Sequence, residues 1–253
     1  MEAAGRVLKL SLHRPSTNAL NRAFGEELFR AFSELEQMEE VTVVVITSAL
    51  EKAFIAGADI KEMAAMDLAE SEAFSKLLQE AYSILPRLKK IVIAAINGHA
   101  MGGGCELALA CDYRFMTRGK AFIGLPEAGL GIVPGAGGTQ RLPRLIGLSK
   151  ALDILLRGRT FGPEEALEIG LVDRLFDADT FMSEVMEFAT TLASGAGKAL
   201  GFIKASVYEG IELPMEKALG TERKYGLENL KTRDAKEGLK AFAEKRKPNF
   251  TNK

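Results

Sequence analysis

Apolar and polar positions divide the first half of the chain into alternating strands and helices. Residues 6–12 alternate apolar and polar side chains, as a strand with one solvated face does. Residues 41–48, "VTVVVITS", form a continuous β-branched run that is typical of a strand buried on both faces. Residues 91–96 and 113–117 also have strand character, and residues 22–38 repeat apolar side chains at helical spacing. This alternation predicts an α/β core.

Glycine-containing turns join a predicted strand to a predicted helix twice. Gly57 lies in a loop over residues 51–63, and a helix is expected from Ile60 to about residue 85. Three contiguous glycines, at residues 102–104, precede a second helix that runs from Cys105 to Cys111. The pattern of strand, glycine turn and helix is therefore used twice.

The second half of the chain has a different pattern. Residues 124–147 are rich in glycine and proline, so we expect them to be mostly irregular. From residue 149 the pattern is helical, with a strand-like break at residues 171–176. Residues 180–247 predict a series of helices, separated at Gly195, Gly210 and Asp234.

Composition and charge narrow the function classes. The chain has 253 residues, a net charge of −1 and 47% hydrophobic residues, which fits one globular domain with or without a helical appendage. The near-zero charge predicts neither a nucleic-acid partner nor an anionic membrane surface. Cys105 and Cys111 have neither metal-ligand spacing nor a histidine cluster, so no metal site is predicted. Without an apolar leader or a long apolar run, the sequence predicts a cytoplasmic protein.

The triple glycine matches no common nucleotide or nucleophile motif. Contiguous Gly102, Gly103 and Gly104 do not form G-x-G-x-x-G, and no P-loop or G-x-S-x-G sequence occurs. His13 and His99 are the chain's two histidines, which gives a serine triad little support. What remains is a turn that feeds a helix N-terminus, where free amides bind negative charge. Two such turns could direct two amides at one oxygen, as an oxyanion hole does.

Two glutamates lie near these turns. Glu106 opens the helix after the glycines, and Glu127 follows in the apolar segment "GLPEAG". A pair of carboxylates beside an oxyanion hole suits acid–base chemistry on a carbonyl compound. Apolar surroundings raise a carboxyl pKa and a helix N-terminus lowers it, so either glutamate can be acid or base. The simpler interpretations are a helix-end charge for Glu106, a loop carboxylate for Glu127 and a helix N-cap for Asp59.

Three ordered motifs identify a family resemblance. "AFIAGADIKEM", "NGHAMGGGCELALACDYR" and "PEAGLGIVPGAGGTQRLPRLIG" resemble the enoyl-CoA hydratase/isomerase (crotonase) family, from about residue 5 to the C-terminal "EKRKPNF". The resemblance implies an α/β, crotonase-like (ClpP/crotonase) spiral of ββα turns over residues 1–190. It also implies a C-terminal helical trimerisation region over residues 191–253. Homotrimers of the family commonly pair into hexamers.

The resemblance also implies the site and the reaction. It makes Glu106 and Glu127 catalytic, and it assigns the amides of Ala58 and Gly103 to the oxyanion hole. The implied reaction is the hydration of a short- or medium-chain 2-enoyl-CoA, with the CoA thioester as substrate and no cofactor. The implied substrate- and CoA-binding residues are Ala56, Gly57, Ala58, Asp59, Ile60, Lys61, Gly102 and, from a neighbouring subunit, Lys245.

Three alternatives stay open within this resemblance. An enoyl-CoA isomerase of the same fold commonly keeps a glutamate at the position of Glu127 and loses the one at Glu106. A branched-chain hydratase of the methylglutaconyl-CoA type would keep both and differ in its pocket. The basic tail "KAFAEKRKPNFTNK" raises a third alternative, an RNA-binding or non-catalytic homologue.

Overall fold

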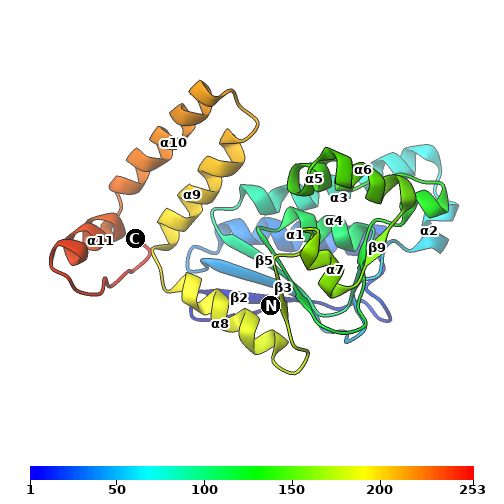
Figure 1. Cartoon of the computed structure of the whole chain (residues 1–253), viewed down its shortest axis with the longest axis horizontal. Coiled ribbons are helices and arrows are strands. Elements are labelled where there is room, and N and C mark those ends of the chain that lie inside the picture. Colours follow the sequence, from blue (N-terminus) through cyan, green and yellow to red (C-terminus); the bar gives the residue numbers. More distant parts are fainter.

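The structure is a computed structural model that describes all 253 residues, and two β-sheets form its centre (Figure 1). Neighbouring strands are parallel, except in the antiparallel pairs β1–β2 and β8–β9. The six-stranded sheet has the order β1 (Glu2–Ala4), β2 (Val7–Leu12), β3 (Val43–Ser48), β5 (Ile91–Ile96), β7 (Tyr113–Thr117) and β10 (Arg174–Phe176). The four-stranded sheet has the order β4 (Ala53–Ile55), β6 (His99–Met101), β8 (Ile123–Gly124) and β9 (Thr160–Phe161).

Helices follow the strands and cover both faces of the larger sheet (Figure 1). The chain up to Ile146 contains α1 (Arg22–Gln37), α2 (Ile60–Ala65), α3 (Leu68–Arg87), α4 (Gly103–Ala110), the 3₁₀ helix η1 (Glu127–Leu130) and α5 (Gly138–Ile146). The second half contains α6 (Leu148–Arg157), α7 (Pro163–Glu168), α8 (Phe181–Ala193), α9 (Gly197–Gly210), α10 (Met215–Leu230) and α11 (Arg233–Ala243). Helices α9 to α11 extend away from the sheets on one side (Figure 1).

The chain winds through the two sheets as a spiral. Strand β3 lies in the larger sheet and β4 in the smaller one, and helices α2 and α3 then lead back to β5. The next turn repeats this order with β5, β6 and α4, and the third with β7, β8, η1 and α5. Because β4, β6 and β8 are parallel neighbours, the turns that follow them lie at the same edge of the smaller sheet.

Strand β3 is buried on both faces, which accounts for the continuous apolar run in its sequence. Successive side chains of a strand point to opposite faces. Val43 and Val45 pack in a cluster with the apolar face of α8, while Val44 and Ile46 belong to the large core cluster on the other face. All four side chains are buried. The prediction of an α/β core with a doubly buried strand is therefore confirmed.

Two sequence expectations differ from the structure. The helix expected from Ile60 to about residue 85 is two helices, because Asp67 and Glu70 form a capping box that starts α3. Residues 124–147, expected to be irregular, contain η1 and α5. Here Gly137, with φ 112°, turns the chain into α5, so glycine marks a helix boundary.

The expected separations between the C-terminal helices are partly correct. Gly195 lies between α8 and α9, as predicted, while Gly210 is the last residue of α9. Asp234 lies inside α11 rather than before it. The helix begins earlier because the Thr232 side chain accepts a hydrogen bond from the Ala235 amide at 3.1 Å and caps it.

A buried ion pair attaches α9 to the core. Lys204 Nζ lies 2.7 Å from Asp112 Oδ2 and also donates to the carbonyl oxygens of Leu85 and Lys90. Asp112 Oδ2 accepts a further hydrogen bond from the Val92 amide at 2.7 Å. The Lys204 and Asp112 side chains are only 4% and 11% exposed. If either partner were removed, water could not replace it in solvating the remaining charge.

We expect Lys204→Met to lower the free energy of unfolding by about 3–5 kcal/mol, because it leaves the Asp112 carboxylate buried without its cation. Lys224→Met is the matched control, since Lys224 is exposed and pairs loosely with Glu209 at 3.7 Å. The control should change stability by less than about 0.5 kcal/mol in urea unfolding experiments. Equal losses in the two variants would contradict a structural role for the buried pair.

Candidate active site

A cavity of about 400 Å³ opens at the edge where β4, β6 and β8 end. Side chains from α2 and α3 form one wall, including Ile60, Met63, Met66 and Phe74. Leu130, at the end of η1, and Ile132 and Val133, which follow it, form another apolar part of the lining. The charged side chains in the lining are Glu106 and Glu127, so the cavity is apolar with a local acidic centre.

The turn after β4 directs one amide at this cavity. Leu20 donates its N–H to the Gly57 carbonyl at 2.8 Å, and the Asp59 amide donates to the Leu20 carbonyl at 2.7 Å. These bonds form a parallel bridge between Leu20 and Ala58. In such a bridge the N–H of the central residue points away from the partner segment. The Ala58 amide is therefore free, and Ala58 lines the cavity.

The turn after β6 supplies a second free amide. The Gly102 amide donates to the Gly124 carbonyl at 2.9 Å, and Gly102 has φ 53°. A Cβ atom on Gly102 would lie 2.9 Å from Glu127 Oε1, so glycine permits a close approach here. Gly103 is the first residue of α4, and its amide consequently has no partner within the helix. Gly103 also lines the cavity, beside Ala58.

Glu106 is buried in the first turn of α4. The residue is 2% exposed, and its Oε1 accepts hydrogen bonds from the amides of Ala136 and Gly138, both at 2.8 Å. Burial raises the pKa of Glu106, whereas these amides and the positive charge of Arg141 lower it. One carboxylate oxygen is thus fixed by backbone groups, which leaves Oε2 for other partners.

Glu127 begins η1 and has a different environment. The residue is 8% exposed, and its Oε2 atom is buried without a hydrogen-bond partner. Burial raises the pKa of Glu127 to about 7, and the nearby charge of Glu106 adds to the increase. Burial thus raises the pKa of both glutamates, which face one cavity with different hydrogen-bond partners.

Most of the residues predicted to form the oxyanion hole or to bind substrate line the cavity. The set consists of Ala56, Gly57, Ala58, Ile60, Gly102 and Gly103. Asp59 and Lys61 are outside the lining. Asp59 caps α2 by accepting a hydrogen bond from the Glu62 amide, which confirms the N-cap interpretation, and it forms an ion pair with Arg14 at 3.2 Å. Contacts of Asp59 and Lys61 with CoA stay predictions.

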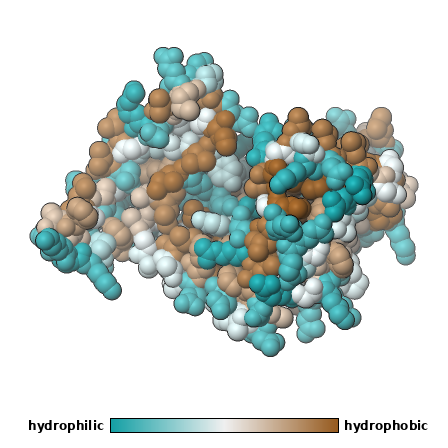
Figure 2. All heavy atoms as spheres, in the orientation of Figure 1, coloured by the Kyte–Doolittle hydropathy of each residue, from teal (hydrophilic) through white to brown (hydrophobic).

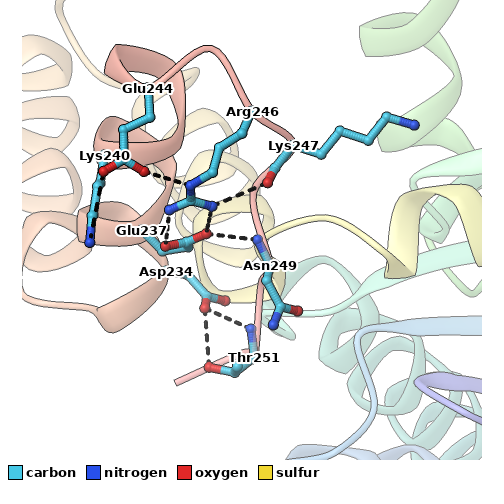
Figure 3. Close-up of polar contacts among 8 residues, drawn as sticks. All are labelled: Asp234, Glu237, Lys240, Glu244, Arg246, Lys247, Asn249 and Thr251. Atoms are coloured by element: carbon cyan, nitrogen blue, oxygen red, sulfur yellow. Dashed lines mark hydrogen bonds and ion pairs between the residues drawn. The ribbon is translucent and has the colours of Figure 1, made fainter.

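Lys245 lies after α11, remote in the sequence from every residue that lines the cavity. The segment around it folds back along α11, and Figure 3 shows the ion pair between Arg246 and Glu237, at 2.7 Å. In the same view the Thr251 amide donates to Asp234 at 2.8 Å. These contacts hold the basic tail against its own helix. The contact of Lys245 with CoA in a neighbouring subunit stays a prediction.

Two residues of the site were not singled out from the sequence. Ala136 acts through its backbone amide, and its signal was the glycine-rich "GAGG" within the third motif. Leu20 lies about forty residues before Ala58 and had no signal of its own.

Comparison with known proteins finds a family match and similar sequences. The sequence model of the enoyl-CoA hydratase/isomerase family matches residues 2–253. The short-chain-enoyl-CoA hydratase of Clostridium acetobutylicum is 40% identical over 98% of this chain and 95% of its own length. The crotonyl-CoA hydratase of Syntrophomonas wolfei is 38% identical over 100% of this chain and 97% of its own.

Solved structures extend the comparison to the fold. An enoyl-CoA hydratase from Geobacillus kaustophilus superposes with a TM-score of 0.96 at 39% identity, covering 98% of this chain and 94% of its own. The enoyl-CoA hydratase from Bacillus anthracis gives a TM-score of 0.95 at 38% identity, covering 100% of this chain and 98% of its own. The spiral therefore has the crotonase fold, as the sequence motifs predicted.

The raised pKa of Glu127 predicts a pH-dependent stability effect. The folded protein binds this proton more tightly than the unfolded chain, so stability falls as pH rises from the usual glutamate pKa toward 7. Replacing Glu127 with Gln removes this loss. We expect Glu127→Gln to be more stabilising at pH 8 than at pH 5 by roughly 2–3 kcal/mol in urea unfolding. The control is the substitution Glu72→Gln at an exposed position. If Glu127→Gln changed the free energy of unfolding by the same amount at pH 5 and pH 8, the predicted effect would be refuted.

Proposed function

The chain belongs to the enoyl-CoA hydratase/isomerase family, and we propose that it reversibly adds water to the 2,3 double bond of a short- or medium-chain 2-enoyl-CoA. The product is a 3-hydroxyacyl-CoA, which makes the enzyme a hydro-lyase. The observation that carries this proposal is the pair of buried glutamates that face one apolar cavity beside two free amides. The named activities of the two bacterial relatives support the same reaction.

The amides of Ala58 and Gly103 bind the thioester oxygen in the proposed mechanism. As water adds to C3 of the enoyl group, the electron pair of the double bond moves toward this oxygen and an enolate forms. Two preorganised N–H donors stabilise its negative charge, and one such donor contributes about 3–4 kcal/mol in comparable enzymes. The residues Ala56, Gly57, Ile60 and Gly102 line the surrounding cavity and are proposed to contact the substrate.

Glu106 and Glu127 divide the proton transfers. Burial raises the pKa of Glu106 overall, but two amides and the charge of Arg141 oppose that rise, so we assign Glu106 as the base that removes a proton from the water attacking C3. Glu127, with a pKa of about 7, carries the proton that is delivered to C2. After one hydration Glu106 holds a proton and Glu127 has lost one, and dehydration reverses both transfers.

The proposed reaction needs no redox partner, because the addition of water changes no net oxidation state. CoA enters as part of the thioester and is therefore substrate rather than a resident cofactor. We propose that Asp59, Lys61 and the neighbouring subunit's copy of Lys245 contact the CoA portion, as the family resemblance implies.

Assembly into a homotrimer or hexamer is also proposed. Figure 2 shows apolar side chains over the α9–α10 hairpin, and Ile203, Val207, Ile211 and Met215 are exposed there. A contiguous apolar face of this kind is typical of an interaction surface. No helix of the chain has the length and apolar character needed to cross a membrane. Its cytoplasmic location stays a prediction from the sequence.

The structure bears on each alternative. An isomerase commonly loses the glutamate equivalent to Glu106, whereas here that residue is present, buried and hydrogen-bonded. A methylglutaconyl-type substrate carries a second carboxylate, and no cationic side chain lines the cavity to receive it. In the basic tail, Arg246 pairs with Glu237 and Glu244, which weakens the case for RNA binding.

We expect the protein to hydrate crotonyl-CoA, and we expect Glu106→Gln and Glu127→Gln each to lower kcat by at least about 100-fold. Each substitution removes one acid–base group, and such groups contribute 10²- to 10⁴-fold. Loss of the enoyl-thioester absorbance measures the rate, and circular dichroism checks the fold of each variant. Full activity in either variant would remove that glutamate from the mechanism. An inert wild type, on crotonyl-CoA and longer enoyl-CoAs, would refute the proposed reaction.

The absence of a cation from the cavity lining predicts selectivity for uncharged acyl chains. Binding an acyl carboxylate beside Glu106 and Glu127 would bury it unpaired. We expect kcat/KM for 3-methylglutaconyl-CoA to be at least about 100-fold lower than for crotonyl-CoA, a difference of about 2.7 kcal/mol. Comparable values for the two substrates would identify a branched-chain hydratase instead.

A further inference from the structure

Arg141 lies in the second turn of α5, and its guanidinium folds back over the segment that binds Glu106. Its Nη1 atom donates to the Ala136 carbonyl at 2.8 Å, and Nη2 donates to Ser83 Oγ, on α3, at 3.3 Å. A Cβ atom at Gly137 would lie 2.1 Å from Nη1, so the guanidinium rests directly on the Gly137 backbone. The side chain is half-buried. Arg141 therefore connects α3 with α5 and with residues 136–137, which precede α5.

The segment under Arg141 is the one that holds the catalytic carboxylate. Ala136 donates its N–H to Glu106 Oε1 while its carbonyl oxygen accepts from Arg141. The amide of Gly138 donates to the same carboxylate oxygen at 2.8 Å. The guanidinium thus holds the backbone of Ala136 from the carbonyl side while the preceding peptide N–H donates to Glu106, and it brings a positive charge close to that carboxylate.

The other titratable groups around Glu106 supply no positive charge. Glu127, on η1, is a second carboxyl group, and the charge of Glu106 raises its pKa. On α3, burial raises the pKa of Tyr82, whose hydroxyl donates to the Gly103 carbonyl at 3.1 Å. On α4, burial raises the pKa of Cys105 and raises that of Cys111 to about 12, so both thiols are neutral at physiological pH. Arg141 is therefore the cation that, beside the two amide hydrogen bonds, opposes the effect of burial on the pKa of Glu106.

We propose that Arg141 is a positioning residue that keeps Glu106 ionised, acting through its charge and through the backbone of residues 136–138. The inference rests on the proposed function, because it assigns Arg141 to the reaction in which Glu106 is the base. Arg141 itself does not line the cavity and need not touch the substrate. Its effect is to separate the protonation states of the two glutamates.

The test compares Arg141→Met, which removes the charge and the hydrogen bonds, with Arg141→Lys, which retains the charge. Arg144→Met is the matched control, because Arg144 is on the same helix, is exposed and pairs with Glu212 at the surface. For each protein, kcat/KM for crotonyl-CoA is measured across the pH range in which the fold is intact. The acid limb of this profile reports the pKa of the essential base in the free enzyme.

Loss of the cation raises the pKa of Glu106, so less of the base is ionised at low pH. We expect Arg141→Met to move the acid limb upward by about one pH unit, at the low end of the effect of an adjacent opposite charge. Its activity should recover toward the wild-type value at higher pH. In Arg141→Lys the acid limb should lie close to its wild-type pH. In Arg144→Met it should not move.

A purely structural role for Arg141 would lower the rate at every pH without moving the acid limb, and that result would overturn the proposal. So would an Arg141→Lys profile that is shifted as far as that of Arg141→Met. If Arg141→Met fails to fold, Arg141→Gln replaces it, because the shorter polar side chain removes the charge while retaining a hydrogen-bond donor.

A second measurement separates this inference from the proposed function. Isotope-edited infrared spectra, with Glu106→Gln as the reference for subtraction, follow the protonation of the Glu106 carboxyl directly. The midpoint should rise in Arg141→Met and return in Arg141→Lys, whether or not the protein hydrates crotonyl-CoA. An inactive wild type with this infrared shift would refute the hydratase proposal and retain the effect of Arg141 on Glu106. An unchanged midpoint would refute the inference.

Discussion

Two amide hydrogen bonds to Glu106 Oε1 connect the second turn of the spiral to the third. The carboxylate comes from α4, and the donors, Ala136 and Gly138, come from the segment that starts α5. A buried carboxylate without such partners would be neutralised by protonation. The geometry of the cavity therefore depends on this junction, since the same segment leads from Glu127 and its apolar neighbours to α5.

The sequence predicts those structural features that are determined by residues close together in the chain. The doubly buried strand at 43–48 follows from a β-branched run, and the N-cap at Asp59 follows from its position before a helix. The glutamate pair stood out because carboxylates are rare in apolar segments. Its specific interpretation came from three motifs, at 53–63, 97–114 and 126–147, which resemble the family whose sequence model matches the chain.

What the sequence did not predict depends on contacts between distant segments. The partners of Glu106 lie about thirty residues away, and they are backbone groups that carry no side-chain signal. The role of Leu20 depends on a bridge to Ala58 that only the folded spiral forms. The glycine and proline content of residues 124–147 predicts irregular structure, whereas Gly137 caps the start of α5 and Pro143 lies inside it.

The strand order of the larger sheet has a consequence for synthesis of the chain. From β2 through β3, β5 and β7 to β10, every strand pairs with one that precedes it in the sequence. Each new strand can consequently pair with a strand that has already been synthesised. The sheet can therefore grow by one strand at a time as the polypeptide leaves the ribosome. Parallel sheets otherwise fold slowly, because their pairings are distant along the chain. A nascent chain that has not yet emerged beyond Gly138 would hold Glu106 without its amide donors, so the chemistry would begin only after the third turn closes.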